Sequence, residues 1–184
     1  MGLRAFLYHD DPQLAAGNFV AVVIAWNQPF YPLYLWLILG DRAWLATPDV
    51  ASALAFLSIP LLARRWPLVA RIALPVFGIV NTFICTLLLG EASGVALFLL
   101  PCAMLAAMLF PRRQRAVMVA IATLPLLAWL ALRGRLPGPV VAMTPEEAAS
   151  VFTMNAISAG VLMIFLGWVL SGLFAALESR RAGA

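Results

Sequence analysis

The sequence contains no lysine, one histidine, two cysteines and few charged residues of either sign. Charged residues make up 11% of the chain and hydrophobic residues 64%, so it lacks the charged surface that keeps a water-soluble domain dispersed. Its 12 basic residues are all arginines, and they stand in short clusters between apolar runs. Clusters in such places set the orientation of a membrane protein, so we expect the lipid bilayer, and no nucleic acid, as a partner.

The side chains that carry most enzyme and metal chemistry are also scarce. His9 stands alone, and Cys85 and Cys102 lie in separate apolar segments without a second ligand at a metal-like spacing. This pattern predicts no metal site and no cofactor. No serine or cysteine in the apolar runs has an obvious general base, and no charged residue stands at the centre of a run, as an ion-coupled transporter requires. We therefore expect no catalytic residues and no enzymatic activity.

Six apolar stretches can cross a membrane as helices. A helix needs about 20 apolar residues to cross the hydrocarbon layer, and it satisfies its own backbone hydrogen bonds there. The expected spans are residues 17–39, 48–63, 69–90, 93–110, 115–133 and 148–176, of which the second and the fourth are the weakest. The sequence thus predicts an all-α, polytopic six-helix membrane domain at residues 17–176. An N-terminal interfacial segment at 1–16 precedes it, and a cytoplasmic tail or output stalk at 177–184 follows.

The arginines predict that both ends of the chain are cytoplasmic. With six spans, nine of the 12 arginines fall on one side of the membrane, and only Arg42, Arg133 and Arg135 fall on the other. Short loops rich in arginine face the cytoplasm. The use of arginine without lysine is typical of a high-GC bacterial genome. We expect a multi-pass protein of a bacterial inner membrane.

Three helix starts carry capping signals. Asp11-Pro12, Thr47-Pro48 and Thr144-Pro145 each place a side chain that can cap before a proline at the first helical position. Glu147 completes a capping box with Thr144. These signals predict helices that begin at Pro12, Pro48 and Pro145, the first of them ahead of the first span.

Neutral hydrogen-bonding side chains inside the spans form the candidate ligand site. Two prolines three residues apart in the first span should kink that helix. Kinked helices with amides at a similar depth can enclose an apolar cavity that suits a small lipophilic ligand. In the alternative interpretation these amides only hold neighbouring helices together. The candidate ligand-binding residues are Trp26, Asn27, Gln28, Tyr31, Tyr34, Asn81, Thr82 and Asn155.

The last span carries small residues at four-residue spacings, and its helical pattern continues past the expected membrane boundary. Small residues at this spacing allow two helices to approach closely. They predict either a homodimer that transmits motion along the last helix or ordinary packing inside one bundle. The residues concerned are Gly160, Gly167, Ser171 and Gly172.

Two local stretches resemble a known group of bacterial sensors. They are Gln28-Pro29-Phe30-Tyr31-Pro32-Leu33-Tyr34-Leu35-Trp36 and Arg64-Arg65-Trp66-Pro67. Together with the six spans they resemble the hexahelical membrane domains of α-hydroxyketone autoinducer histidine kinases and the six-helix anchors of class III adenylate cyclases. The resemblance implies a homodimeric receptor for a small apolar signal, with a cytoplasmic kinase or cyclase partner. Those proteins carry the output domain after the last helix, whereas this sequence stops at Ala184. It is therefore either a membrane domain of a longer protein or a protein that signals through a separate partner.

Two other functions use the same features. An accessory subunit of a larger membrane complex would dock other helices on its aromatic and small-residue faces. A transporter or channel for a neutral solute would need a polar path to both sides of the membrane, which the inner halves of the third and fourth spans hardly offer. The sequence favours a non-enzymatic membrane sensor that relays its signal through the last helix.

Overall fold

The computed structural model describes residues 2–46, 48–135 and 138–182, and every regular element in these ranges is a helix. The predicted all-α fold class is therefore confirmed. In chain order the elements are α1 (Leu3–Leu7), α2 (Pro12–Asn27), α3 (Phe30–Leu39), the 3-10 helix η1 (Gly40–Ala46), α4 (Pro48–Arg65), α5 (Pro67–Leu89), η2 (Glu91–Ser93), η3 (Val95–Phe98), α6 (Leu99–Leu109), η4 (Arg112–Gln114), α7 (Arg115–Leu132) and α8 (Pro145–Ala182).

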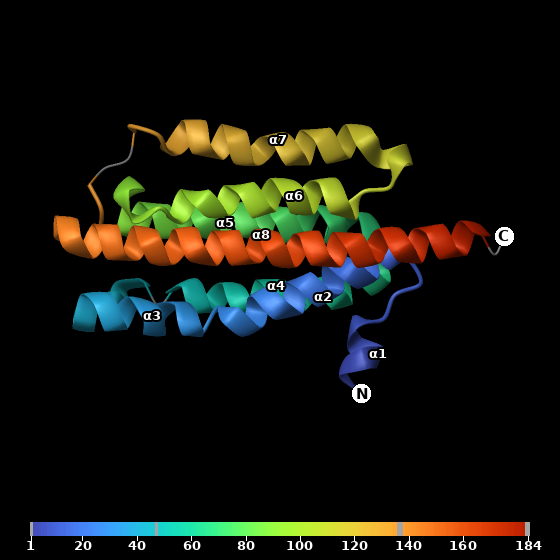
Figure 1. The fold of residues 1–184 in the computed structure, drawn as a ribbon, viewed down its shortest axis with the longest axis horizontal. Helices are drawn as coiled ribbons and strands as arrows, with labels where there is room; N and C mark the ends of the chain where they lie inside the picture. The colour runs from blue at the N-terminus through green and yellow to red at the C-terminus, as the bar shows by residue number, and fades with distance from the viewer. Residues whose placement is uncertain (1, 47, 136–137, 183–184) are drawn as a thin grey trace.

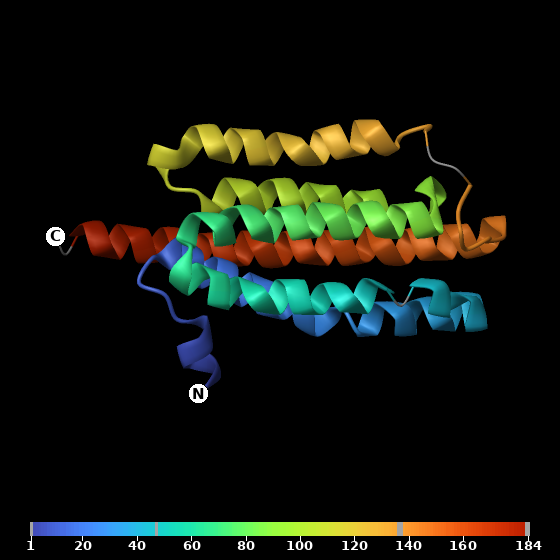
Figure 2. The same cartoon turned by 180° about the vertical axis from the view of Figure 1, so that it is seen from behind.

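The long helices run side by side along one axis (Figure 1). α8 extends along the whole bundle, α7 lies on the outside against α6 and α5, and α2, α3 and α4 lie on the other side (Figures 1 and 2). α1 and the end of α8 lie toward the same end of the bundle as the α4–α5 and α6–α7 connections (Figure 2). These connections carry Arg64, Arg65, Arg112 and Arg113, so we call this the arginine-rich end.

Within the described ranges, four helical segments are long and apolar enough to cross a membrane. They are Pro12–Trp44, Pro67–Leu89, Arg112–Leu132 and Pro145–Ser179. The other two predicted spans correspond to α4 and to the shorter apolar helix Val95–Leu109. Helices are thus present at all six predicted positions, while six crossings and cytoplasmic ends stay predictions.

The capping signals produce the helix starts that they predict. The Asp11 carboxylate accepts hydrogen bonds from the amides of Gln13 at 2.9 Å and Leu14 at 3.4 Å, and α2 begins at Pro12. At α8 the Thr144 amide donates to the Glu147 carboxylate at 2.9 Å, and the Glu147 amide donates to the Thr144 hydroxyl at 3.2 Å. α4 begins at Pro48, while its predicted cap, residue 47, lies outside the described residues.

A buried ion pair joins α2 to α5 at the arginine-rich end. The Arg71 side chain is only 4% exposed and binds the carboxylate of Asp11, which is 34% exposed. Beside it, the side-chain amide of Gln13 donates to the carbonyl of Met108 at 3.0 Å and so holds α2 against α6. In the sequence Arg71 counts only as one of the nine arginines expected on the cytoplasmic side, and its ion-pair partner, sixty residues away in the chain, cannot be identified from the local pattern.

Two side chains fasten α1 to the bundle. The buried Asn18 donates to the carbonyl of Leu7 at 3.2 Å, and Arg64 donates to the carbonyl of Ala5 at 2.7 Å. These bonds satisfy carbonyls at the end of a helix of only five residues, which has few intrahelical bonds of its own. Residues 2–10 are therefore attached to the arginine-rich end by side chains from α2 and α4.

The ion pair makes stability depend on pH in the acid range. Burial raises the pKa of Asp11, but the hydrogen bond and charge of Arg71 and the amides of Leu14 and Gln13 outweigh it and lower the pKa below 3.8. The folded state thus binds this proton more weakly than the unfolded chain. The resulting stability is present above pH 3.8 and is lost as pH falls through the folded pKa. Thermal unfolding in detergent should show this loss, and Asp11→Asn should flatten the profile in that window.

Candidate functional site

The first long helix is interrupted where the two prolines stand. α2 ends at Asn27 and α3 begins at Phe30. Pro29 and Pro32 have no backbone N–H to donate, so the regular series of helical hydrogen bonds is interrupted there. The amide of Tyr31 donates instead to the carbonyl of Gln28, at 3.3 Å. The predicted kink is confirmed; beside it Gln28 is buried, whereas Asn27 stays exposed.

A pocket of about 490 Å³ lies beside this break. Every long helix except α7 contributes to its wall. The lining residues are Val23, Ile24, Asn27, Gln28, Tyr31, Tyr34, Phe56, Gly78, Asn81, Thr82, Cys85, Val95, Phe98, Pro101, Cys102, Leu105, Ile157, Ser158, Val161, Leu162 and Phe165.

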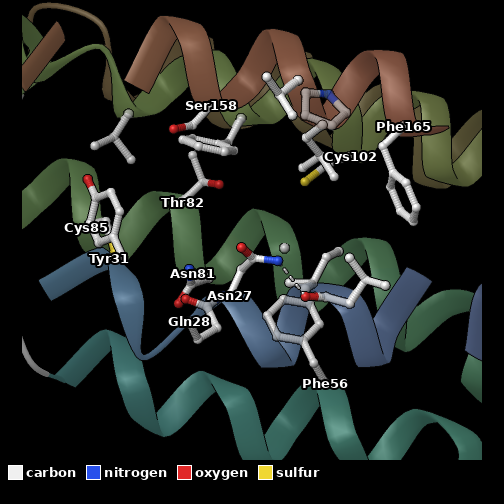
Figure 3. A pocket seen from close by; sticks show the side chains of 18 of the residues that line it. Asn27, Gln28, Tyr31, Phe56, Asn81, Thr82, Cys85, Cys102, Ser158 and Phe165 are labelled. Atoms are coloured by element: carbon white, nitrogen blue, oxygen red, sulfur yellow. Dashed lines mark hydrogen bonds between the residues drawn. The ribbon is translucent and has the colours of Figure 1, made fainter. Parts of the chain in front are cut away.

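The polar groups of the pocket gather on one side. Figure 3 shows the amides of Asn27, Gln28 and Asn81 close together, with Cys102 and Phe165 across the cavity. The side-chain N–H of Asn27 donates to the carbonyl of Val23 at 2.9 Å, which fixes the orientation of this amide. A cavity with one hydrogen-bonding side and otherwise apolar walls recognises a small molecule that has a polar group and a hydrocarbon part.

The electrostatics of the pocket favour an uncharged ligand. Among the described residues that line it, none is Asp, Glu, Lys, Arg or His. A charged ligand would leave water without a compensating partner, at a large cost. The described part of the chain also contains no group of three or more His, Cys, Asp or Glu side chains placed to hold a metal ion.

The structure brings together six of the eight candidate ligand-binding residues. Asn27, Gln28, Tyr31, Tyr34, Asn81 and Thr82 all line the pocket. Trp26 lies elsewhere, with its side chain 73% exposed and its ring 6.4 Å from that of Phe30. Asn155 is fully buried outside the lining and donates to the carbonyl of Ser93 at 2.9 Å, so it ties α8 to η2. Ligand binding by any of the eight stays a prediction.

Most of the apolar wall could not be predicted from the sequence. Phe56, Leu105 and Phe165 line the pocket, but each stands in a run that is apolar on all sides, so no pattern distinguishes it. Cys85 and Cys102 also face the cavity, although the sequence indicates only small buried residues. The spacing of Asn81 and Cys85, one helical turn apart, is the signal that could have found Cys85.

The small residues of α8 do not pack inside this chain. A Cβ atom added at Gly160, Gly167 or Gly172 would meet no described atom within 4 Å. Among the glycines inside helices, the close approaches occur instead at Gly17 of α2 and Gly78 of α5, where an added Cβ would lie 2.7 Å from Leu109 and from Cys102 respectively. The glycines of α8 therefore form, with the exposed Ser171, an open face along that helix.

The sequence model of the MASE7 family matches residues 11–182. The match begins at the cap of α2 and ends with α8, so it covers the whole helical bundle apart from α1. No curated protein matches the chain.

Proposed function

This chain belongs to the MASE7 family of membrane-associated sensor domains, and on that premise we propose that it is a non-enzymatic receptor for a small, uncharged, lipophilic signal. The observation that carries the proposal is the uncharged pocket of about 490 Å³ with three amides on one side. The receptor is proposed to lie in a bacterial inner membrane and to relay ligand binding through α8 to a cytoplasmic kinase or cyclase output.

The amides suit a ligand that carries a carbonyl or hydroxyl group. Each amide has both a donor and an acceptor, and in apolar surroundings an unpaired polar group is costly while a hydrogen bond is strong. A ligand oxygen would pair with Asn27, Gln28 or Asn81, and its hydrocarbon part would contact Leu105 and Phe165. The pocket thus favours a ligand that has one polar end and one apolar end.

The relay is supported by the position of α8. This helix lines the pocket through Ser158, Leu162 and Phe165 and continues without interruption to the arginine-rich end. Its 38 residues span about 57 Å. A ligand that binds one position of α8 better than another shifts the population of positions, and a continuous helix carries that shift to its end.

We also propose that α8 pairs with the α8 of a second copy. The support is the open face of Gly160, Gly167, Ser171 and Gly172. A Cβ atom added at any of its three glycines would have no described atom within 4 Å. Close contact through small residues is a common mode of helix pairing in lipid. Such a pair would bring two output units together at the arginine-rich end.

The test is ligand-dependent stabilisation of the purified full chain. Neutral lipid extracts of bacterial culture medium, and decanol as a defined probe, should raise the thermal unfolding temperature in detergent. Asn27→Leu and Asn81→Leu should each remove a ligand hydrogen bond and weaken binding about tenfold or more. Both variants should still insert into membranes. Trp26→Leu, outside the pocket, should keep the wild-type response and is the matched control.

Two outcomes would contradict the receptor. No extract or neutral probe would change the unfolding temperature, or the two asparagine variants would respond as Trp26→Leu does. Flux of a neutral solute through liposomes that contain the protein would instead support a transporter.

A further inference from the structure

We infer that the pocket is filled sideways from within the bilayer, through an opening between α3 and α8, by an uncharged amphiphile dissolved in the lipid. The inference rests on the proposed function for the role of the pocket as a receptor site. The route itself follows from the exposure of the lining residues, from the packing above and below the pocket, and from its charge.

The exposed lining residues lie on one side of the pocket. They are Asn27 on α2, Tyr34 on α3, and Ile157 and Val161 on α8. The lining residues that come from α4, α5, η3 and α6 are all buried or half-buried. The wall is therefore closed toward those helices and open where α2 and α3 face α8.

A second, open groove continues from this opening. It lies between α3 and the first part of α8 and is lined by Tyr34, Ala149, Ser150, Thr153, Met154, Ile157 and Ser158. Tyr34, Ile157 and Ser158 line both the groove and the pocket. These three side chains thus stand at the passage from one to the other.

Packed side chains block both axial routes. Toward the arginine-rich end the pocket is followed by a core that includes the fully buried Leu74, Leu109 and Leu166. Toward the other end a separate core includes Leu35 and Leu89. Cores of this kind contain few voids as large as a water molecule, so among the residues that the structure describes we find no axial aqueous path to the pocket.

With the predicted crossing of α8 at residues 148–176, the lateral opening falls within the hydrocarbon layer. Ile157 is twelve residues after Pro145, which is about 18 Å along α8, in a layer about 30 Å thick. The side chain of Ile157 is 62% exposed. Leu33 and Leu37, which stand close to Tyr34 in the sequence of α3, are also exposed. Exposed apolar side chains at this depth face lipid.

The uncharged lining of the route favours an uncharged ligand. Neither the pocket nor the groove has a charged residue among the described residues that line it. An ion would have to leave the interface and cross hydrocarbon before reaching amides that cannot neutralise it, at a high cost. An uncharged amphiphile already partitions into the bilayer and needs only to exchange one apolar surrounding for another.

The experiment compares two photoreactive probes on the full chain in phosphatidylcholine nanodiscs. Adamantane diazirine is small, uncharged and soluble in the bilayer, and a sulfonated diazirine is confined to water. After photolysis, mass spectrometry with residue resolution measures carbene insertion at Gly78, Asn81, Thr82 and Cys85, the residues of the segment 78–85 of α5 that line the pocket. Val80 and Ile84 of the same segment are exposed outside the pocket and are counted separately. We expect the uncharged probe to label the pocket-lining residues strongly and the sulfonated probe to leave them almost unlabelled.

Variants at the opening test the route. Ile157→Trp should fill the passage and reduce labelling by the uncharged probe severalfold, whereas Tyr34→Ala should increase it. Ile164→Trp is the matched control, since Ile164 lies on α8, is 76% exposed and lines neither the pocket nor the groove. Labelling equal in Ile157→Trp, Tyr34→Ala and Ile164→Trp, or strong labelling by the sulfonated probe, would overturn the lateral route.

Competition at matched chain length tests the class of ligand. Decanol should protect Asn81, Thr82 and Cys85 of the pocket wall from the uncharged probe, while decanoate and decyltrimethylammonium should not. Equal protection by either ion would overturn the uncharged class. If the labelling is as expected but neither an extract nor decanol changes the unfolding temperature, the lateral route is supported and the proposed receptor function is contradicted. Failure of the route and failure of the receptor function can therefore be told apart.

Discussion

Asp11→Asn is expected to lower the free energy of unfolding by about 3 kcal/mol. The substitution leaves the Arg71 guanidinium buried, with its side chain 4% exposed, and without its counter-charge. The Nε of Arg71 already has no hydrogen-bond partner among the described residues. This loss is at the lower end of the range for breaking a buried ion pair. Asp11 is 34% exposed, so water can enter beside the guanidinium and replace part of the lost interaction.

Companion variants separate the charge from the helix cap. Asparagine caps helices about as well as aspartate, so the loss in Asp11→Asn reports the ion pair. The double variant Asp11→Asn with Arg71→Met leaves no buried charge and should lose much less stability. Arg71→Met leaves only the carboxylate of Asp11, which is 34% exposed and can be hydrated, so its loss should lie between those of the other two. Arg65→Met, at an exposed arginine of the same end, is the control. Unfolding in mixed micelles with increasing sodium dodecyl sulfate gives the four values, and a double variant as unstable as Asp11→Asn would contradict this account.

The fold could be predicted from the sequence wherever the decisive signal is local. Pro12 and Pro145 begin helices because a cap and a fixed proline φ act within one turn, and both starts are observed. The ion pair of Asp11 with Arg71 could not be predicted in the same way. Sequence shows where a charge stands along the chain, but its partner is set by the packing of α2 against α5.

The candidate site was predictable on its polar side only. An amide inside an apolar run is unusual, so Asn27, Gln28 and Asn81 could be recognised, and all three line the pocket. Asn155 and Ser158 stand three residues apart on α8, yet only Ser158 faces the cavity. A helix that is apolar on all faces carries no periodic signal for its inner side, so the sequence could not decide between them.

Glycine shows the same limit. Small-residue spacing predicts close contacts on α8, while the helical glycines with observed close contacts are Gly17 on α2 and Gly78 on α5. Spacing tells which residues share a face of one helix, but not whether another helix covers that face. The open glycine face of α8 is therefore information that only the three-dimensional arrangement supplies, and it supports the proposed pairing with a second copy.

Gly94→Ala is expected to lower the free energy of unfolding by about 2 kcal/mol. Gly94 has a φ of +72°, which alanine adopts only at a cost, and an added Cβ would lie 2.6 Å from the Phe152 ring. Phe152 is partly exposed and can turn outward, so the backbone conformation contributes most of the loss.

The Gly94→Ala substitution should also affect α8, because Asn155 of that helix donates to the carbonyl of Ser93, the residue before Gly94. A shift of this turn should lengthen that bond and loosen the first part of α8, beside the groove at Tyr34. Adding Phe152→Ala to Gly94→Ala removes the ring contact and should recover only the smaller part of the loss. Gly160→Ala should instead raise the stability of the single chain in micelles by up to about 1 kcal/mol, since within one chain it adds a helix-favouring residue in open space. Unfolding in mixed micelles measures all three, and equal effects of alanine at Gly94 and Gly160 would show that the turn does not hold α8 in place.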